Sequence, residues 1–267
     1  MWMNYMHWFA GLNDNDSYYK ELYITALKSS KKTRLVPILL YNGSDDAFVQ
    51  MVKSHDAQVI LHEPFFCHRE NFLNKPTDWK NTALGAFLRV DIPKICEMHG
   101  INADYVLYTD CDVIFMKDPT DELSKYKPLY FACCSESCPT NFVCFNSGVM
   151  LINVINMLKT YNHFINQIDK NHYNYEAYDQ GALQVCYKNH VDKLSLLLNH
   201  KPYWGRNDNA IIVHYHGPKP RDIINYINGT PSPHDAYNYL FSLTSAIIWK
   251  YYLFVYQNNS LIDKNNK

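Results

Sequence analysis

The sequence has almost no net charge and few charged residues. Its 267 residues include 25 Lys and Arg against 26 Asp and Glu, a net charge of −1 with histidine neutral. This balance gives no field that would collect nucleic acid or an acidic membrane surface. Charged residues make up 19 % of the chain and hydrophobic residues 47 %, which excludes a disordered protein. We therefore expect a globular protein with no nucleic-acid partner.

Cysteine is too sparse for a disulfide scaffold, at eight residues in the whole chain. Four of the eight lie close together, at positions 133, 134, 138 and 144, but they lack the Cys-x-x-Cys pair that is typical of a zinc site. The apolar N-terminal stretch contains no Lys or Arg, unlike a secretory signal peptide. These features together favour a reduced, cytoplasmic protein.

The chain also lacks internal repeats and a long linker. Apolar runs alternate with helical segments in its first half, which predicts parallel strands in a sheet covered by helices. We expect strands at 6–12, 35–41, 58–62, 105–109, 129–134, 146–154 and 210–216, and helices at 18–29, 79–98 (interrupted at Pro93) and 154–170. The prediction is an α/β protein with a single domain over residues 1–232 and a C-terminal helical extension over 233–267.

The extension contains a long apolar segment, residues 239–256, which Lys250 interrupts. A helix that spans a membrane needs about 20 apolar residues, and a central lysine costs a few kcal/mol. A packed terminal helix is therefore favoured. The alternatives are a spanning helix and an interfacial helix that rests on a membrane, with Trp249 near the lipid headgroups. The second alternative would make the protein peripheral at a membrane surface.

Two acids, Asp110 and Asp112, flank Cys111 at the end of the predicted strand 105–109. In an extended chain, residues two apart point to the same side, so the carboxylates can converge. Two such charges repel each other and resist burial, and a divalent cation with oxygen ligands removes that conflict. Ligands of open α/β sheets bind at this end of the strands. The alternative is a pair of acids in an exposed turn.

Three later motifs supply further polar groups. Asn146 and Ser147 stand at the mouth of a strand and suit the hydroxyl groups of a sugar, and Gly148 lets a ligand or a backbone come close. An acid and an amide at 179–180 open a helix. The stretch 213–220, "VHYHGPKP", ends a strand with two histidines that can complete a metal site and a lysine that can meet a phosphate.

In this order the motifs resemble those of the retaining nucleotide-sugar glycosyltransferases of the glycogenin and bacterial lipooligosaccharide galactosyltransferase group, known as family 8. That group has Asp-x-Asp, then Asn-Ser/Ala-Gly, then Asp-Gln, then His-x-x-Gly with Lys-Pro. The resemblance covers about residues 6–220. The last motif departs from the group's Gly-x-x-Lys-Pro-Trp: the stretch 217–220 is one residue shorter, and Arg221 replaces the Trp.

The resemblance implies a GT-A fold, a Rossmann-like mixed sheet flanked by helices, and a metal-dependent transfer of a hexose-type sugar from a UDP-sugar to an acceptor hydroxyl with retention. The cofactor would be Mn²⁺ or Mg²⁺, and the acceptor a glycan, a protein or a lipid. The implied metal ligands are Asp110, Asp112 and His214, with His216 as a rival to His214, and the implied catalytic residues are Asp179 and Gln180. The implied donor contacts are Ala10, Gly11, Leu12, Asn13, Tyr19, Arg89, Asp110, Cys111, Asp112, Asn146, Ser147, Gly217 and Lys219.

Two other functions fit parts of the same pattern. One is a non-catalytic module that binds sugar nucleotides on the same fold. The other is a phosphatase of the haloacid-dehalogenase type, in which the first acid of a "DCD" motif is the nucleophile. That fold has the motif near its N-terminus, whereas here a complete strand–helix–strand unit precedes it.

Overall fold

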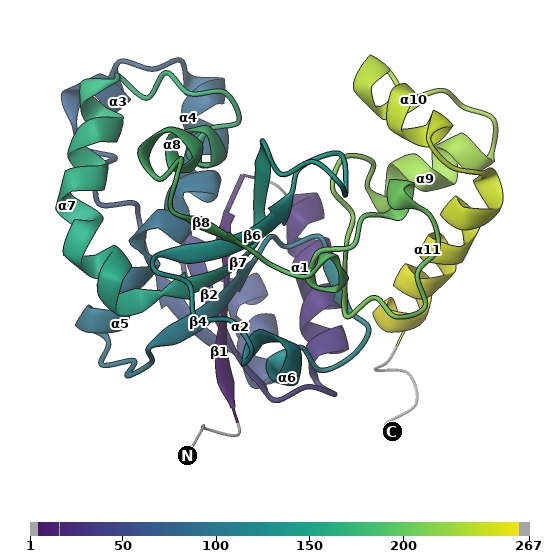
Figure 1. The fold of residues 1–267 in the computed structure, drawn as a ribbon, viewed down its shortest axis with the longest axis horizontal. Helices are drawn as coiled ribbons and strands as arrows, with labels where there is room; N and C mark the ends of the chain where they lie inside the picture. The colour runs from purple at the N-terminus through teal and green to yellow at the C-terminus, as the bar shows by residue number, and fades with distance from the viewer. Residues whose placement is uncertain (1–4, 16, 262–267) are drawn as a thin grey trace.

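The computed structural model describes residues 5–15 and 17–261, and its centre is a seven-stranded mixed sheet (Figure 1). The strand order is β3-β2-β1-β4-β7-β6-β8, and a separate two-stranded sheet pairs β5 with β9. The strands are β1 (Met6–Asn13), β2 (Leu35–Asn42), β3 (Gln58–Leu61), β4 (Tyr105–Thr109), β5 (Val113–Phe115), β6 (Phe131–Ser135), β7 (Phe145–Asn153), β8 (Val191–Lys193) and β9 (Ile212–His214). The predicted α/β fold with a mixed, helix-flanked sheet is confirmed.

Strands β1 to β4 pair in parallel, whereas β7 is antiparallel to both β4 and β6. The helices are α1 (Ser17–Ser30), α2 (Ala47–Ser54), α3 (Glu70–Leu73), α4 (Thr77–Ala86), α5 (Ile92–Met98), α6 (Thr120–Leu123), α7 (Val154–Lys170), α8 (Asp179–Cys186), α9 (Pro220–Ile227), α10 (Asp235–Ser242) and α11 (Ala246–Ser260). Short 3-10 helices lie at η1 (Phe87–Asp91), η2 (Leu196–Leu198) and η3 (Pro202–Trp204).

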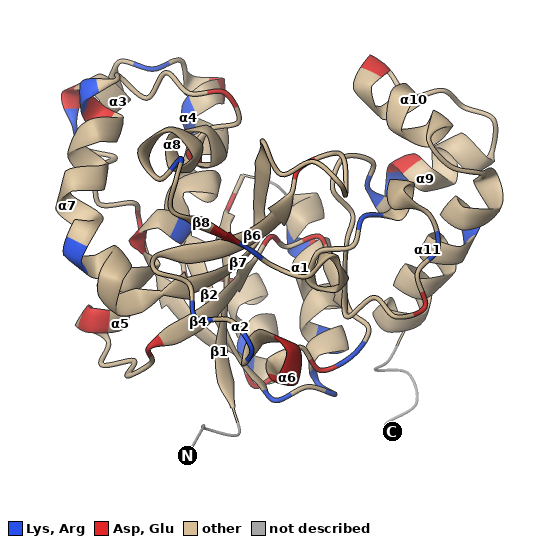
Figure 2. Cartoon of the chain, viewed as in Figure 1, with Lys and Arg blue, Asp and Glu red and all other residues tan. Residues whose placement is uncertain are grey.

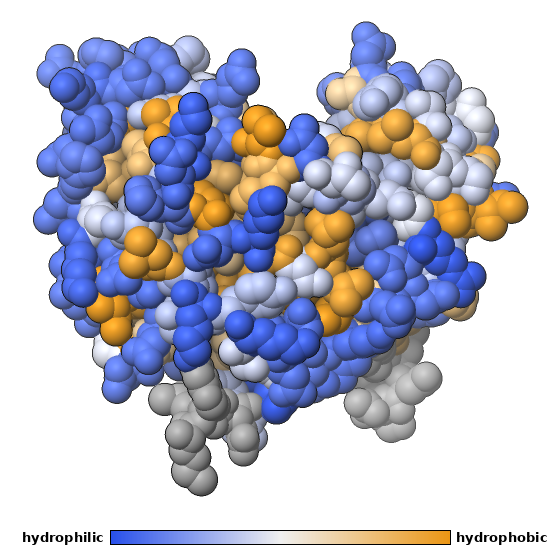
Figure 3. Space-filling model, in the orientation of Figure 1, coloured by the Kyte–Doolittle hydropathy of each residue, from blue (hydrophilic) through white to orange (hydrophobic). Residues whose placement is uncertain are grey.

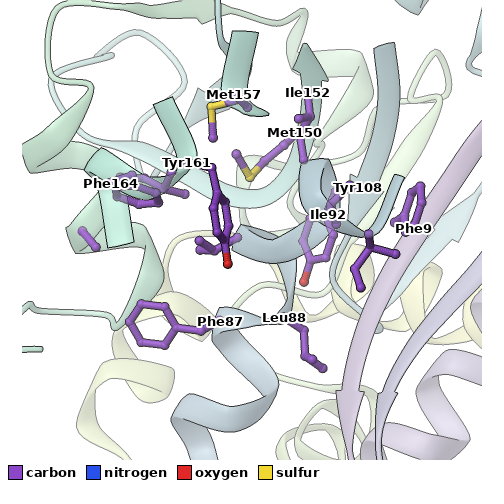
Figure 4. Close-up of a cluster of buried hydrophobic side chains, with 14 of the residues drawn as sticks. Phe9, Phe87, Leu88, Ile92, Tyr108, Met150, Ile152, Met157, Tyr161 and Phe164 are labelled. Carbon is purple, nitrogen blue, oxygen red and sulfur yellow. The ribbon is translucent and has the colours of Figure 1, made fainter. Parts of the chain in front are cut away.

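The apolar strands bury both faces of the sheet, as a helix-covered sheet requires. Side chains alternate along each strand, so Phe9 packs with α5 and α7 on one face while Trp8 packs with α1 and α2 on the other. Figure 4 shows part of the first cluster, to which Tyr108 and Met150 of the central strands and Phe164 of α7 all belong. Lys, Arg, Asp and Glu are scattered over helices, strands and loops alike, with both signs of charge interspersed (Figure 2).

The predicted helix over 79–98 is instead three elements, and the interruption at Pro93 was placed wrongly. The break is η1, where Leu88 lies so close to β1 that a Cβ added at Gly11 would be 2.9 Å from its Cβ. This tight approach turns the chain before α5 begins. Pro93 then occupies the first turn of α5, where a missing N–H group costs nothing.

The C-terminal extension is a packed helical unit, but two helices replace the single helix predicted over 239–256. A continuous helix would separate Phe241 and Trp249 by about 12 Å. In the structure the chain folds back between α10 and α11, so the two rings are 4.9 Å apart, and Trp249 is fully buried. The Tyr256 hydroxyl of α11 lies 3.3 Å from Thr25 of α1, which joins the extension to the rest of the chain.

Ile247 and Phe254 of α11 are exposed. Apolar side chains are visible on the surface of the part of the molecule that carries α9, α10 and α11 (Figure 3). Within the described residues, no helix has both the length and the apolar character that crossing a bilayer requires. The domain boundary at 232 and the contact of this extension with a membrane surface stay predictions.

Candidate active site

The paired acids and one histidine come together where β4 ends. The strand stops at Thr109 and β5 starts at Val113, so Asp110 and Asp112 stand in a bent link and not in the extended strand that was expected. The antiparallel pairing of β5 with β9 sets Val113 opposite His214. As a result, Nε2 of His214 lies 3.3 Å from Oδ1 of Asp112 and 3.7 Å from Oδ2 of Asp110.

These three side chains fit a divalent cation. One ligand atom from each lies within 4.8 Å of the other two. Oδ1 of Asp112 is buried without a hydrogen-bond partner, which is costly unless something positive meets it. Gly148 keeps the space open, because a Cβ there would be 2.3 Å from Cε1 of His214 and 2.6 Å from Oδ2 of Asp110. Carboxylate oxygen and imidazole nitrogen are both common ligands of divalent metal ions.

His216, the rival metal ligand, points to a different set of partners. Its Nε2 lies 2.9 Å from Oε1 of Glu136, and its Nδ1 lies 2.8 Å from the Tyr203 hydroxyl. Burial lowers the pKa of His216, although the Glu136 carboxylate acts in the opposite direction. Both ring nitrogens are therefore engaged away from the paired acids, and the geometry favours His214.

Lys219 brings a positive charge to the same place despite the shortened motif. Its ammonium group forms an ion pair with Oδ2 of Asp112, donates to the Tyr215 carbonyl at 2.9 Å and lies 5.8 Å from the Tyr19 ring centre. Burial opposes the ionisation of Asp112, but Lys219 and then His214 hold the pKa of its carboxyl group well below its usual value. The turn before Lys219 needs its glycine, because Gly217 has φ +79°.

Arg89, from η1, joins two of the predicted acids. Its guanidinium lies 2.8 Å from Oδ1 of Asp110 and 3.0 Å from Oδ2 of Asp179, and it donates to the Ser147 carbonyl at 2.7 Å. Asp179 is only 3 % exposed. Burial raises the pKa of Asp179 to about 6, even though Arg89 favours the ionised form. The break between α4 and α5 therefore places the buried guanidinium group of Arg89 in the site.

The predicted sugar-contacting residues are enclosed by protein groups. Asn146 and Ser147 are each 3 % exposed. The Ser147 hydroxyl donates to Asp179 at 3.2 Å, and the Ser147 backbone N–H donates to Oε1 of Gln180 at 2.9 Å. The structure therefore brings the Asn-Ser-Gly motif and the Asp-Gln motif into direct contact with each other, and contact of either motif with a donor sugar stays a prediction.

A cavity of about 560 Å³ opens beside the paired acids. Its lining includes seven of the predicted donor residues: Gly11, Leu12, Asn13, Tyr19, Arg89, Asp110 and Cys111. Ala10 of β1 is instead buried in the core, on the face of the sheet that α1 and α2 cover. In Figure 3 the surface is hollowed between the side that carries α4 and α8 and the side that carries α9 and α10.

One wall of this cavity was not predicted from the sequence motifs. Helix α4 presents Asp78, Asn81, Thr82 and Gly85 to it. Their spacing places these four residues on one face of the helix. A helical face of polar and small residues, next to the sheet edge where ligands bind, could have been recognised in the sequence. The carbonyl of Asn81 accepts a hydrogen bond from the Asn13 side chain, which ties this wall to β1.

Comparison with solved structures identifies the fold. The chain superposes on the apo form of the glycosyltransferase GlyE from Streptococcus pneumoniae TIGR4 with a TM-score of 0.60 and 20 % identity, covering 94 % of this chain and 63 % of that one. It superposes on the galactosyltransferase LgtC, in complex with donor and acceptor sugar analogues, with a TM-score of 0.61 and 18 % identity over 90 % of this chain and 97 % of that one.

Mouse xyloside xylosyltransferase 1 is a further similar structure, with a TM-score of 0.57 and 16 % identity over 86 % of this chain and 99 % of that one. No protein-family model matches the sequence, and no curated protein matches it either. The chain spans less than two thirds of GlyE but nearly the whole of LgtC. These likenesses show that the chain has the GT-A glycosyltransferase fold.

Proposed function

We propose that this protein is a metal-dependent glycosyltransferase that moves a hexose-type sugar from a UDP-sugar to an acceptor hydroxyl group with retention. The observation that carries the proposal is the convergence of Asp110, Asp112 and His214 beside the cavity, at the end of the central strand. The likeness to several glycosyltransferases supports it over a phosphatase, which rests on the short "DCD" stretch alone.

A cation held by these three side chains, Mn²⁺ or Mg²⁺, would supply charge neutralisation for the diphosphate leaving group. Lys219 stands next to Asp112 and adds a second positive charge that can meet a phosphate oxygen. Tyr19 is both a neighbour of Lys219 and part of the cavity wall, which suits a stacking contact with the base. The diphosphate would therefore lie between the paired acids and the turn at Gly217.

The acid and the amide of the Asp-Gln motif would serve the sugar end. Asp179 is enclosed, and its Oδ2 is held by Arg89 and by the Ser147 hydroxyl. A carboxylate held by two donors is better suited to fixing Arg89 than to attacking the anomeric carbon. This favours attack by the acceptor on the face that the diphosphate leaves, with a phosphate oxygen taking the acceptor proton, over a covalent intermediate on Asp179.

The decisive experiment compares Asp112→Asn with the wild-type protein. A thermal-shift panel of UDP-sugars with Mn²⁺ selects the donor, and release of UDP measures transfer and hydrolysis. We expect the wild type to release UDP only when the metal is present. The variant should release UDP at least about a hundredfold more slowly under the same conditions. His216→Ala is the matched control and should retain metal-dependent release. Full activity of a folded Asp112→Asn variant contradicts the metal assignment.

The same panel distinguishes the other two functions. A sugar-nucleotide binding module would show a metal-dependent thermal shift with UDP-sugars but no release of UDP. A phosphatase would release p-nitrophenol from p-nitrophenyl phosphate with Mg²⁺ and would show no preference for nucleotide sugars.

A further inference from the structure

Asn199 connects the candidate metal site to the candidate catalytic amide, and none of the sequence motifs includes it. It follows η2 and is fully buried. Its Oδ1 lies 2.9 Å from Nδ1 of His214, and its Nδ2 donates to Oδ1 of Asn146 at 2.9 Å. Asn146 in turn donates from Nδ2 to Oε1 of Gln180 at 3.3 Å. A hydrogen-bonded chain therefore runs from His214 to Gln180 and is buried as far as Asn146.

A backbone group fixes the polarity of this chain at Asn146. The N–H of Gly148 donates to Oδ1 of Asn146 at 3.2 Å, and a backbone N–H can only donate. The oxygen of the Asn146 amide must therefore face Gly148, and Asn199 must offer its NH₂ group to that same oxygen. This leaves the oxygen of Asn199 pointing at His214.

A second backbone group fixes the other end. The N–H of Ser147 donates to Oε1 of Gln180, so the oxygen of Gln180 faces the strand. The NH₂ group of Asn146 then donates to that oxygen, which agrees with the orientation set by the neighbouring glycine. The NH₂ group of Gln180 is the end of the amide that these bonds leave for a ligand.

The consequence for His214 concerns its tautomer. The side-chain oxygen of Asn199 can only accept, so the proton of a neutral ring must sit on Nδ1. Nε2 then presents its lone pair to Asp112 and Asp110, at 3.3 and 3.7 Å. Only this tautomer can ligate a cation between the three side chains, because a protonated nitrogen offers no lone pair.

We propose that Asn199 is a positioning residue that holds His214 in the Nδ1–H tautomer and ties the imidazole, through Asn146, to Gln180. The use of that tautomer for a cation rests on the proposed function, whereas the tautomer itself does not. Asn199 thus joins the part of the site that would hold the diphosphate to the part that would hold the sugar.

The test is the ¹⁵N NMR spectrum of the histidine rings, with the His214 signals assigned by their loss in His214→Gln. Recorded at a pH at which the ring is neutral, the wild type should show a protonated Nδ1 and an unprotonated Nε2. In Asn199→Ala the acceptor is gone and Nε2–H can donate to Oδ1 of Asp112, so we expect the Nε2–H form to appear. Asn153→Ala is the matched control, since Asn153 is also buried with two side-chain hydrogen bonds, to Pro128 and Asn156, outside the site. It should leave the His214 signals unchanged.

Calorimetric titration with Mn²⁺ alone gives the second readout. Asn199→Ala should bind the metal about 10- to 100-fold more weakly, and Asn153→Ala as the wild type does. If Asn199→Ala does not fold, Asn199→Asp keeps the oxygen acceptor and should keep the Nδ1 proton. An unprotonated Nδ1 in the wild type, or in Asn199→Asp, overturns the proposal.

The two proposals fail in different ways. If the wild type binds no Mn²⁺ but Asn199→Ala still shifts the His214 tautomer, the positioning role stands and the proposed function falls. If the wild type binds Mn²⁺ and Asn199→Ala changes neither the tautomer nor the affinity, the positioning role is refuted and the proposed function stands.

Discussion

Gly148→Ala adds a single methyl group at the most crowded point of the candidate site. The new Cβ would stand 2.3 Å from Cε1 of His214 and 2.6 Å from Oδ2 of Asp110. Ordinary carbon contacts begin near 3.5 Å, so the imidazole would have to withdraw by about 1 Å. Metal–ligand distances tolerate only about 0.2 Å. The required movement is therefore several times larger than a metal site can absorb.

The side chains of His214 and Asp110 cannot move away from the new methyl group without a cost in free energy. His214 is 1 % exposed and is held through Nδ1 by Asn199, and Asp110 is held through Oδ1 by Arg89. Overpacking of this kind costs about 1–3 kcal/mol of stability, which is less than the 5–15 kcal/mol that typical domains possess. We expect the variant to fold, with a lower melting temperature, and to bind Mn²⁺ at least about tenfold more weakly.

Isothermal titration with Mn²⁺ and thermal unfolding measure the two effects. Gly85→Ala is the matched control: it adds the same methyl group beside the same cavity, but its closest neighbours, atoms of Asn13, would be 3.6 Å away. Gly85 lies in α4, where alanine is the better helix former, so this control should be at least as stable as the wild type. Wild-type Mn²⁺ affinity in Gly148→Ala would refute the placement of the cation between these side chains.

Two further predictions concern the charged groups. Lys219→Met leaves Asp112 as a buried carboxylate without its ammonium partner, which should lower the free energy of unfolding by about 3–5 kcal/mol. Mn²⁺ should then raise the melting temperature of this variant more than that of the wild type. Equal shifts in melting temperature would contradict the role of Asp112 as a partner of both cations. Because the pKa of Asp179 is raised from 3.8 to about 6, its contribution to stability is fully present below pH 3.8 and is lost as the pH rises through 6. Urea unfolding from pH 4 to pH 7 should therefore show the wild type losing on the order of 3 kcal/mol relative to Asp179→Asn, and a pH-independent difference would count against a raised pKa.

The order of the motifs could be read from the sequence, because three of them stand at or beside the end of a strand and the Asp-Gln motif opens a helix. Apolar runs mark the strands, so the positions of Asp110 and His214 at β4 and β9 follow from local patterns. Their approach could not be derived in the same way. It depends on the antiparallel pairing of β5 with β9, two strands of three residues each, whose partners lie about a hundred residues apart along the chain.

Helix breaks were the least predictable features, since tertiary contacts cause them. The η1 turn follows from the packing of Leu88 against Gly11, and the turn before α11 follows from the packing of Trp249 on Phe241. Hydrophobic periodicity shows which residues share one face of a helix or strand. It does not show that Leu88 packs against Gly11, or that Trp249 folds back onto Phe241. Asn199 was missed for a similar reason: a single asparagine after an apolar run looks like the end of a helix, and only its two buried partners reveal another role.

The charges of the site explain why a metal and a diphosphate would depend on each other. Asp110, Asp112 and Asp179 contribute three negative charges when ionised, and Arg89 and Lys219 contribute two positive charges, which leaves a net charge of about −1. A site with that sign repels a diphosphate. With a divalent cation between the paired acids, the net charge becomes about +1 and the same place attracts it. Since Lys219 is bound to Oδ2 of Asp112 while Oδ1 stays without a partner, the carboxylate can hold both cations at once, and the metal need not displace the lysine.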